Sequence, residues 1–356
     1  MKILHVITSL RTGGAEKLMV DILPRMNNQG IQADLCIFDG VRTPFYDDIR
    51  SKGVNVIDFG VDNSVYNPQN ISRLRKILRN YDIIHTHNTS PQFFTAIANI
   101  GIGKKLVTTE HNTYNRRRSW PGFAAIDRWM YGKYKSIICI SDKAEENLRN
   151  FLGSESAAIT TIYNGVDINS YANAEPSLEL EQIAPGSKKI IMVAAFRPQK
   201  DQATLIKAIK QLPEDFHLFL VGEGECKEEN IRLSKQLGIG HRIHFMGRRS
   251  DVAQLLRASD YVVMSSHYEG LSLSSVEGMS VGKPFIASDV DGLREVVKGY
   301  GVLFPHQDSN YLANTINSLP CDSENYLHIA ESCQQRAKQY DIDNMIKGYL
   351  SLYKSI

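Results

Sequence analysis

The chain has 356 residues, which is more than one ordinary hydrophobic core organises and suits two α/β domains of roughly 150–180 residues each. A hydrophobic fraction of 42% and a charged fraction of 22% are those of a globular protein, and the net charge of +2 gives no support for nucleic-acid binding. The five cysteines form no CxxC pair, so they indicate free thiols in a reducing cytoplasm and argue against a zinc site or a disulfide framework.

An apolar run at residues 3–10 follows Met1 and Lys2 and stops at Arg11. The run is shorter than the apolar core of a signal peptide and lacks a small-residue cleavage site, so it predicts a first β-strand. No stretch of the sequence approaches the ~20 apolar residues that a membrane-spanning helix needs. We therefore expect a cytosolic protein or one that lies on a membrane surface.

Two glycines, Gly13 and Gly14, follow this strand and precede a helical pattern over residues 17–23. Glycine at a strand-to-helix turn lets the backbone approach a bound ligand closely. The sequence GGAE is not the GxGxxG fingerprint of a dinucleotide fold, which argues against a dehydrogenase. Two interpretations of the turn stay open: contact with a ligand, and a tight turn that needs glycine only for its conformation.

Strand and helix patterns then alternate along the chain. Strands are predicted at residues 32–38, 54–59, 82–85, 105–109 and 136–141, and helices at 71–79, 92–99 and 142–148. This alternation predicts a doubly wound parallel sheet, in which ligands bind at the carboxyl ends of the strands.

Histidines occur at two of these strand ends, in the sequences HTHN and EHN. His87 and His111 each fit either a place in the acceptor or reaction site or an ordinary structural role. We expect His85 to be structural, on the ground that its strand parity differs from that of His87. Asn112 follows His111 and is a candidate for the same site.

A basic run at residues 116–118, which includes Arg116 and Arg117, is followed by aromatic residues and lysines up to residue 135. A run of charges is most often a solvated loop. Lysine and arginine interleaved with tryptophan and tyrosine also suit contact with anionic headgroups or a lipid diphosphate. The first domain is then predicted to end within residues 160–167, with a strand that runs into the turn dipeptide Asn164-Gly165. Residues 169–188, which hold Pro176, Pro185 and Gly186, are predicted to form a linker.

The second domain is predicted to begin with a strand at residues 189–194 and a helix from Gln202. Arg197 and Lys200 lie in the loop between them, where cations would neutralise a diphosphate leaving group. Two exposed loop cations are the alternative interpretation. A strand with a glycine turn at 217–225, a helix at 228–237 and the sequence FMGRRSDV follow.

Residues 266–290 carry two carboxylates, Glu269 and Glu277, with seven residues between them. The preceding run at 261–264 predicts a buried strand, and a helix is predicted to begin at Leu273 with Ser272 or Ser274 as its N-cap. A strand, a Gly/Ser loop and a helix N-terminus present backbone N–H groups to an anion, most simply a phosphate. The alternative is an ordinary turn with a capped helix and two solvated glutamates. A strand at 301–305, two helices and an amphipathic segment at 343–354 complete the chain.

The sequence EGLSLSSVE resembles the Glu-x7-Glu motif of the family-four retaining glycosyltransferases, and GGAE, EHN, YNGVD, PQKD, LVGEGE and GRRSDV occur in that family's order. The resemblance implies a GT-B fold, with two Rossmann-like, doubly wound parallel-sheet domains facing a cleft. It further implies an acceptor-binding domain at 1–168 and a nucleotide-sugar-binding domain at 186–339. Residues 340–356 are then expected to form a helix that packs back on the first domain.

The same resemblance assigns roles to residues. It implies that Glu277 binds the ribose of a nucleotide-sugar, that Glu269 lies by the donor sugar, and that the amides of Leu273 and Ser274 hold the diphosphate. Lys200 matches a cationic position of the family. The family arginine is replaced by Ala195, so either Arg197 takes over its contact or that contact is missing.

The candidate residues form three groups. They are His111, Glu269 and Lys200 for catalysis; Gly14, Arg197, Lys200, Arg248, Glu269, Gly270, Leu273, Ser274 and Glu277 for the donor; and His87, Asn112, Arg116 and Arg117 for the acceptor.

The resemblance implies a retaining transfer of a sugar from a nucleoside-diphosphate-sugar to a hydroxyl of a saccharide acceptor, without a covalent enzyme intermediate. We single out no residues as metal ligands and expect no metal or other cofactor. The acceptor that we expect is a polyprenyl-diphosphate-linked saccharide of a bacterial surface polysaccharide, reached from the cytoplasmic side of a membrane. An epimerase, a phosphorylase and a non-catalytic nucleotide-sugar or glycan-binding protein remain as alternatives, and the sugar, the base and the linkage stay open.

Overall fold

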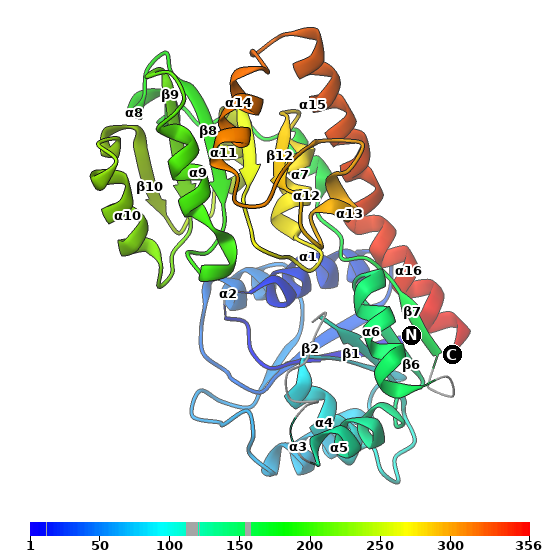
Figure 1. Cartoon of the computed structure of the whole chain (residues 1–356). Coiled ribbons are helices and arrows are strands. Elements are labelled where there is room, and N and C mark those ends of the chain that lie inside the picture. Colours follow the sequence, from blue (N-terminus) through cyan, green and yellow to red (C-terminus); the bar gives the residue numbers. More distant parts are fainter. Residues whose placement is uncertain (12, 112–119, 121, 154–157) are drawn as a thin grey trace. The chain divides into compact units, whose positions relative to one another are not determined.

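The computed structural model describes residues 1–11, 13–111, 120, 122–153 and 158–356. The chain divides into two compact units (Figure 1). Unit 1 comprises Met1–Gly165 together with Ile342–Ile356, and unit 2 comprises Val166–Asp341. Among the described residues, no helix has both the length and the apolar character that crossing a bilayer requires.

Unit 1 is built on a parallel sheet whose described strands have the order β3-β2-β1-β4-β5-β6-β7. Most of these strands are buried on both faces and therefore appear in the sequence as continuous apolar runs. The strands are β1 (Lys2–Ile7), β2 (Gln32–Ile37), β3 (Val56–Asp58), β4 (Ile83–His87), β5 (Lys105–Glu110), β6 (Ser136–Cys139) and β7 (Ala158–Thr161).

Helices cover both faces of this sheet. They are α1 (Gly14–Asn28), α2 (Pro44–Ser51), α3 (Gln69–Leu78), α4 (Thr89–Ala98), α5 (Phe123–Tyr131), α6 (Asp142–Leu152) and α16 (Ile342–Ser355). Side chains alternate along β1, so Ile3 and Ile7 pack with α1, α2 and α16, whereas Leu4 and Val6 pack with α3, α4, α5 and α6.

The helix α16 belongs to unit 1 although it follows unit 2 in the sequence. Its buried residues recur every three or four positions, at Ile342, Met345, Ile346, Tyr349 and Tyr353, which places them on one face of the helix. This face joins the same apolar core as α1 and β1.

Unit 2 holds a second parallel sheet, with the described strand order β10-β9-β8-β11-β12-β13. Its strands are β8 (Lys188–Val193), β9 (Phe216–Val221), β10 (Ile243–Gly247), β11 (Tyr261–Met264), β12 (Phe285–Ser288) and β13 (Val302–Phe304). Its α-helices are α7 (Ile168–Ala172), α8 (Glu179–Ile183), α9 (Gln202–Ile209), α10 (Lys227–Gln236), α11 (Val252–Ala258), α12 (Leu273–Ser280), α13 (Arg294–Val297), α14 (Ser309–Asn317) and α15 (Glu324–Ala337).

The strand order reverses beside β8, because the chain adds β9 and β10 on one side and β11 to β13 on the other (Figure 1). The loops that leave the carboxyl ends of β8 and β11 lie at this point of reversal. Open α/β sheets bind their ligands at such a point. The loop after β8 contains the short 3₁₀ helix η2 (Pro198–Lys200).

The prediction of a linker at residues 169–188 is wrong. Two short helices, α7 and α8, occupy this segment, and Ile168 and Leu180 are buried in the core of unit 2. Arg249 holds α8 in place, because its guanidinium binds Glu179 at 2.5 Å and Asp251 at 2.7 Å. Prolines in the segment suggested a linker, but the apolar positions between them pack onto the domain.

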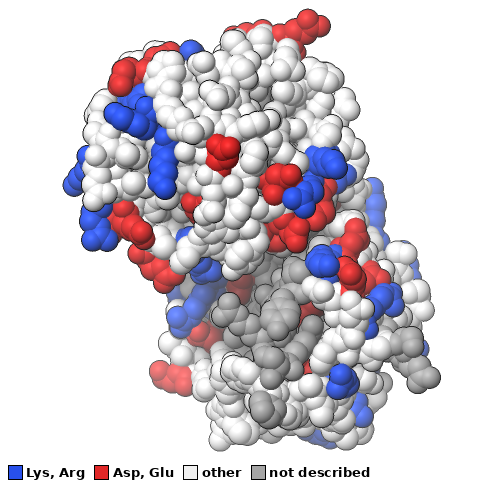
Figure 2. Space-filling model, in the orientation of Figure 1, with Lys and Arg blue, Asp and Glu red and all other residues white. Residues whose placement is uncertain are grey.

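Charges of both signs are interspersed over the face drawn in Figure 2, with no extended field of one sign among the described residues. This distribution agrees with a net charge of only +2 for the whole sequence.

Candidate functional site

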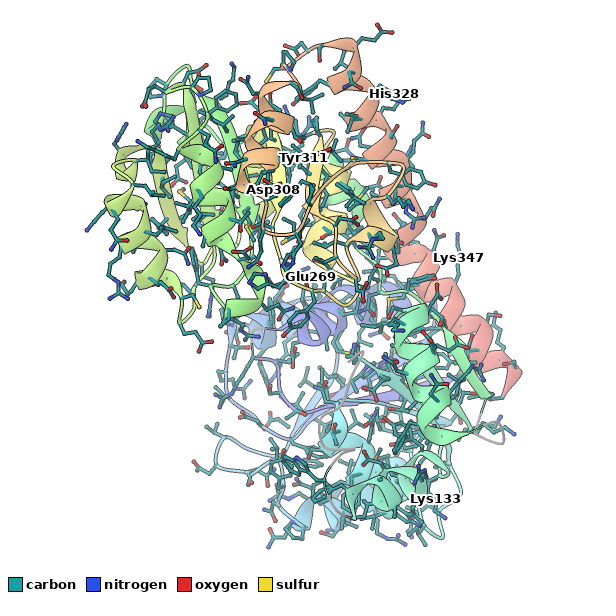
Figure 3. The ribbon with its side chains drawn as sticks, viewed as in Figure 1. Lys133, Glu269, Asp308, Tyr311, His328 and Lys347 are labelled. Atoms are coloured by element: carbon teal, nitrogen blue, oxygen red, sulfur yellow. The ribbon has the colours of Figure 1, made fainter. Side chains whose placement is uncertain are left out.

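Lys200 and Glu269 form a largely buried ion pair beyond the carboxyl ends of β8 and β11. The Lys200 ammonium lies 2.5 Å from the Glu269 Oε1 atom, and the two side chains are only 17% and 6% exposed. The Ser266 hydroxyl donates a second hydrogen bond to the same oxygen, at 2.6 Å. Two residues that are 69 positions apart in the sequence are thus held in one site, which Figure 3 locates by its label on Glu269.

Hydrogen bonds between the two loops fix the pair. The His267 N–H donates to the Gln199 carbonyl at 2.8 Å, and the Gln199 amide donates to the Tyr268 carbonyl at 3.0 Å. The Asp201 side chain caps α9 by accepting from the Thr204 N–H at 3.2 Å. The cation and the carboxylate are therefore positioned before any ligand binds.

Gly292 supports the loop that carries Glu269. It has a φ of +84°, and a Cβ atom added there would lie 2.3 Å from the carbonyl oxygen of Glu269 and 2.4 Å from that of Gly270. Backbone atoms cannot move away from such a contact without shifting the loop. Only glycine fits this position, for reasons of both conformation and space.

Replacing Gly292 by alanine is expected to displace Glu269 and to destabilise unit 2 by about 1–3 kcal/mol. Gly299→Ala is the matched control, because Gly299 has a φ of +83° but nothing within 4 Å of an added Cβ. Thermal unfolding should show a larger fall in Tm for Gly292→Ala than for Gly299→Ala. Equal falls would mean that the close approach to Glu269 contributes nothing.

The helix α12 begins at Leu273, with Ser272 as its N-cap residue. The first N–H groups of an α-helix, here including those of Leu273 and Ser274, have no partner within the helix and attract an anion. Gly278 sets the helix close to the sheet, because an added Cβ would lie 2.8 Å from Val262 and from Phe285. Glu277 lies four residues into the helix and is half-buried.

Two neighbouring arginines after β10 have different surroundings. Arg249 is bound by Glu179 and Asp251, and this contact lowers the pKa of both carboxyl groups and raises the pKa of the guanidinium. Arg248 is exposed. Arg248, the donor-binding candidate, is thus the more exposed of the two arginines.

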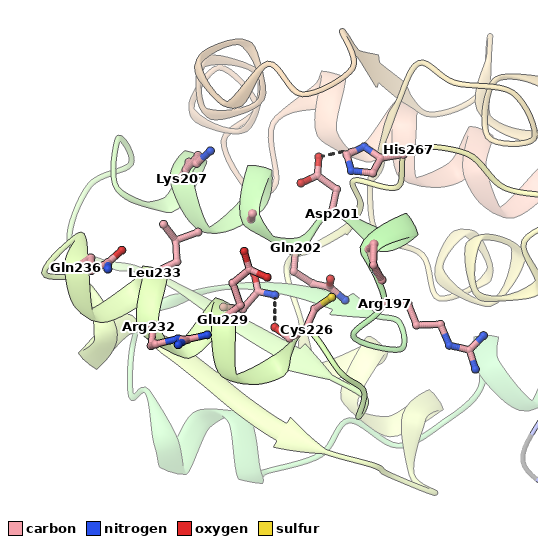
Figure 4. A pocket seen from close by; sticks show the side chains of 13 residues that line it. Arg197, Asp201, Gln202, Lys207, Cys226, Glu229, Arg232, Leu233, Gln236 and His267 are labelled. Atoms are coloured by element: carbon pink, nitrogen blue, oxygen red, sulfur yellow. Dashed lines mark hydrogen bonds and ion pairs between the residues drawn. The ribbon is translucent and has the colours of Figure 1, made fainter.

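Arg197 lines a groove between α9 and α10 (Figure 4). The lining also includes Asp201, Lys207 and Arg232, but neither Lys200 nor Glu269, and the groove has a volume of about 640 Å³. The structure thus brings Lys200 to Glu269, whereas the guanidinium of Arg197, the proposed replacement for the family arginine, extends away from the other lining side chains in Figure 4.

Two Asp-x-Asp triplets, at residues 289–291 and 341–343, are present in the sequence and received no weight in the sequence analysis. Asp289 and Asp291 both bind Arg294, at 2.5 Å and 3.4 Å. The two carboxylates of this triplet thus share an arginine as their ion-pair partner.

Three histidines form a hydrogen-bonded chain in unit 1. The Nε2 atom of His111 lies 3.0 Å from Nδ1 of His87, and Nε2 of His87 lies 3.0 Å from Nδ1 of His5. His5 and His87 are completely buried, whereas His111 at the end of β5 is partly exposed. His111 is therefore the member that can touch a bound molecule, and His87 lies behind it.

His85 lies on the same face of β4 as His87, and the expectation of opposite faces is wrong. Residues two positions apart on a strand share a face, and the two rings lie 4.4 Å apart. His85 binds the hydroxyl of Tyr353 at 2.5 Å and that of Thr109 at 2.7 Å. These bonds link β4 to α16 and give His85 a structural role.

Ring nitrogens of His5, His85 and His87 lie within 4.8 Å of one another, a spacing at which three imidazoles could hold a metal ion. Both nitrogens of His85 and of His87 already have hydrogen-bond partners. Of the ring nitrogens of these three histidines, Nε2 of His5 is the one without a hydrogen-bond partner. The cluster is therefore better described as a hydrogen-bond network than as a prepared metal site.

Acid is expected to destabilise unit 1 through these histidines. Burial lowers the pKa of His5 to about 3 and of His111 to about 4, and lowers the pKa of His85 and His87 well below 6.5. The unfolded chain then binds protons that the folded chain excludes. Stability is complete above pH 6.5 and falls as the pH drops towards 4, by up to about 1.4 kcal/mol per pH unit for each histidine.

Chemical unfolding at pH 7.5 and pH 5.5 measures this effect. His87→Asn should lose less stability between the two pH values than the parent does. The variant lacks one of the histidines that bind a proton in the unfolded chain but not in the folded one. His328→Asn, at an exposed histidine of α15, serves as the control. A pH dependence that His87→Asn leaves unchanged would contradict the assignment.

Gly14 is the exposed first residue of α1. At its neighbour Gly13 an added Cβ would meet only the Glu16 side chain, whose carboxylate can move away, so space does not require glycine there. Asn112, Arg116 and Arg117 lie outside the described residues. The sequence analysis missed His5, Ser266 and Gly292, although a histidine within the apolar run ILHVI was a usable indication of a buried polar cluster.

Comparison with known proteins identifies the family of the chain. The family model described as Glycosyltransferase Family 4 matches residues 12–170, and the model described as Glycosyl transferases group 1 matches residues 177–339. Between them they leave only residues 1–11, 171–176 and 340–356 unmatched.

Several individual proteins are similar over most of their length. A UDP-Gal:alpha-D-GlcNAc-diphosphoundecaprenol alpha-1,3-galactosyltransferase of Escherichia coli is 26% identical over 84% of this chain and 82% of its own. An N-acetyl-alpha-D-glucosaminyl L-malate synthase of Bacillus anthracis is 27% identical over 78% of this chain and 75% of its own.

The crystal structure of HepE from Anabaena in complex with UDP-glucose covers both chains completely, with 25% identity and a TM-score of 0.85. Its fold is that of two parallel-sheet α/β domains, as found here. The chain therefore belongs to family four of the glycosyltransferases and has their GT-B fold.

Proposed function

We propose that the chain transfers a sugar, with retention of configuration, from a nucleoside-diphosphate-sugar to a hydroxyl of a saccharide acceptor. The observation that carries the proposal is the Lys200–Glu269 pair, fixed at the strand-order reversal of unit 2 and in the loop that leads into α12. A nucleoside-diphosphate-sugar is an elongated ligand that would use these groups together. Its diphosphate would bind the helix N–H groups and the cation, and its sugar hydroxyls would bind the carboxylate.

Charge on the departing diphosphate is the main barrier to this reaction. The bond from the anomeric carbon to the phosphate oxygen breaks, the bond to the acceptor oxygen forms, and the acceptor proton passes to a phosphate oxygen. Lys200 and the amides of Leu273 and Ser274 stabilise the negative charge as it develops. Glu277 binds the ribose, and Arg248 lies by the base.

We assign His111 of unit 1 to the reacting sugar, with His87 as the residue that positions it. The hydrogen bond between His87 Nδ1 and His111 Nε2 couples the tautomers of the two rings. His111 is held neutral by burial, since its pKa is lowered to about 4. A neutral imidazole suits contact with sugar hydroxyls and with a phosphate oxygen that must accept a proton.

The donor that we propose is a uridine diphosphate sugar, and the acceptor is a saccharide on a polyprenyl diphosphate. HepE was solved with UDP-glucose, and the similar Escherichia coli enzyme is named for a diphosphoundecaprenol-linked acceptor. A panel of nucleotide-sugars tested by thermal shift identifies the donor, because a bound donor raises Tm by mass action. Absence of any shift at millimolar donor would argue against the proposal.

Product analysis separates the transferase from the two other activities. A transferase releases the nucleoside diphosphate and forms a new glycosidic bond whose anomeric configuration matches the donor. A phosphorylase would consume orthophosphate, and an epimerase would convert the nucleotide-sugar without an acceptor.

The reaction is expected to proceed without a divalent cation, because Lys200 supplies the positive charge at the diphosphate. Turnover in excess EDTA should stay within about twofold of the untreated rate, whereas loss of a catalytic metal would cost several kcal/mol of barrier stabilisation. An inhibition by EDTA that Mg²⁺ or Mn²⁺ reverses would contradict this expectation.

A further inference from the structure

The outward face of α5 in unit 1 is apolar. Phe123, Ile126 and Trp129 are 36%, 42% and 40% exposed, and Trp120, just before the helix, is 56% exposed. Ile126 and Trp129, three residues apart, share one side of the helix, and Phe123 is its first residue. Met130 and Tyr131 pack with the apolar core under the sheet, so α5 carries both buried and exposed apolar side chains.

Both tryptophans of the sequence lie on this segment. Tryptophan favours positions where one end of the ring is apolar and the other is wet, as at the headgroup level of a bilayer. The Trp120 ring packs edge-on against Phe123 at 5.5 Å, which makes the apolar side chains contiguous. Contiguous exposed apolar side chains rimmed by polar residues mark an interaction site.

The charges around these side chains are positive. Lys133 and Lys135 are exposed, and the Lys133 ammonium lies 5.3 Å from the centre of the Trp129 ring. Arg128 is also exposed, and its guanidinium donates to the Phe151 carbonyl at 3.3 Å. The one acid of α5, Asp127, is completely buried. Long basic side chains beside aromatic rings complement anionic lipid headgroups, because their stems cover the apolar surface while the charges reach the phosphates.

We propose that this α5 face, defined by Trp120, Phe123, Ile126, Trp129 and Lys133, docks on an anionic lipid bilayer. The helix lies in the plane of the headgroups, with its apolar side chains inserted and its cations on the phosphates. The aromatic and basic composition of the face favours a lipid surface over a second copy of the chain, since cations on both copies would repel. Its purpose rests on the proposed lipid-linked acceptor, but the docking itself needs neither donor nor acceptor.

Tryptophan fluorescence reports directly on this docking, because both tryptophans lie on the proposed contact. Vesicles of phosphatidylglycerol and phosphatidylcholine in equal parts are expected to shift the emission to shorter wavelength, and brominated acyl chains are expected to quench it. Vesicles of phosphatidylcholine alone should bind at least tenfold more weakly. Unchanged emission at millimolar anionic lipid overturns the proposal.

Two exposed lysines of unit 1 provide a matched pair of variants (Figure 3). Lys133→Glu reverses a charge on the α5 face and is expected to weaken vesicle binding at least tenfold, whereas Lys347→Glu on α16 should leave it within twofold. Phe123→Asp/Ile126→Asp, which keeps both tryptophans as probes, should abolish the shift while thermal unfolding shows that the protein remains folded. Equal binding by Lys133→Glu and Lys347→Glu, or a dimer that blocks the face without vesicle binding, would overturn the assignment.

The test of vesicle binding is independent of the proposed function. Vesicle binding is measured without substrates, and turnover of Lys133→Glu on a soluble acceptor is expected to match the parent. Loss of vesicle binding with normal transfer to the soluble acceptor isolates the docking face.

Discussion

Replacing Lys200 by methionine is expected to lower turnover by roughly 10- to 1,000-fold, because one cation that stabilises the departing diphosphate is removed. Methionine keeps most of the length and volume of the lysine stem, so the packing of the loop after β8 is preserved. Steady-state kinetics with a saturating donor measures the change in kcat. A turnover within twofold of the parent would show that Lys200 does not serve the reaction.

A fall in activity must be separated from a loss of folding, since Glu269 would remain buried without its cation. Removing one partner of such a pair destabilises a protein by about 3 kcal/mol or more. Lys200→Met/Glu269→Gln removes the unpaired charge and is expected to recover Tm but not turnover. Lys207→Met, at an exposed lysine further along α9, is the control and should be as active as the parent.

Replacing Glu277 by alanine is expected to weaken donor binding by two or more orders of magnitude. Two hydrogen bonds from ribose hydroxyls to a carboxylate contribute about 1.5–3 kcal/mol each, and alanine removes both. Titration calorimetry with UDP, which carries the ribose but no sugar, tests this contact alone. Glu269→Ala should weaken binding of the nucleotide-sugar more than binding of UDP.

Glu331→Ala, at an exposed residue of α15, controls for a change in overall charge. Unchanged UDP affinity in a folded Glu277→Ala protein would remove Glu277 from the donor site. Equal losses for UDP and for the nucleotide-sugar in Glu269→Ala would contradict the assignment of Glu269 to the sugar.

Most of the sheet was predictable because its strands are short apolar runs bounded by polar turns. The run predicted at 189–194 is β8 at Lys188–Val193, and the helices predicted from Gln202 and Leu273 begin at those residues. The helices α2, α5, α7, α8 and α13 were not predicted. In α2 only Tyr46 and Ile49 are buried, which is too few for a periodic pattern, and α5 is apolar on its outer side, which obscures the pattern.

Single residues of the candidate site were predictable only where a local pattern marks them. Lys200 and Glu269 each follow a strand, but their contact depends on β8 and β11 being neighbours, which no local pattern states. Gly292 lies in the loop after β12 and supports Glu269 through close backbone contacts. The relation of His5 to His87 likewise requires the pairing of β1 with β4.

The return of α16 to unit 1 determines the order in which the chain can complete its folding during synthesis. Unit 2 is contiguous and can close as soon as it has left the ribosome, whereas the core around β1 must wait for Tyr349 and Tyr353. The 176 residues of unit 2 take roughly 10–35 s to translate, and during that time the part of the first sheet that α16 covers is exposed. The core of the amino-terminal half is therefore the last to be completed during synthesis, and changes to the last helix should be felt there first.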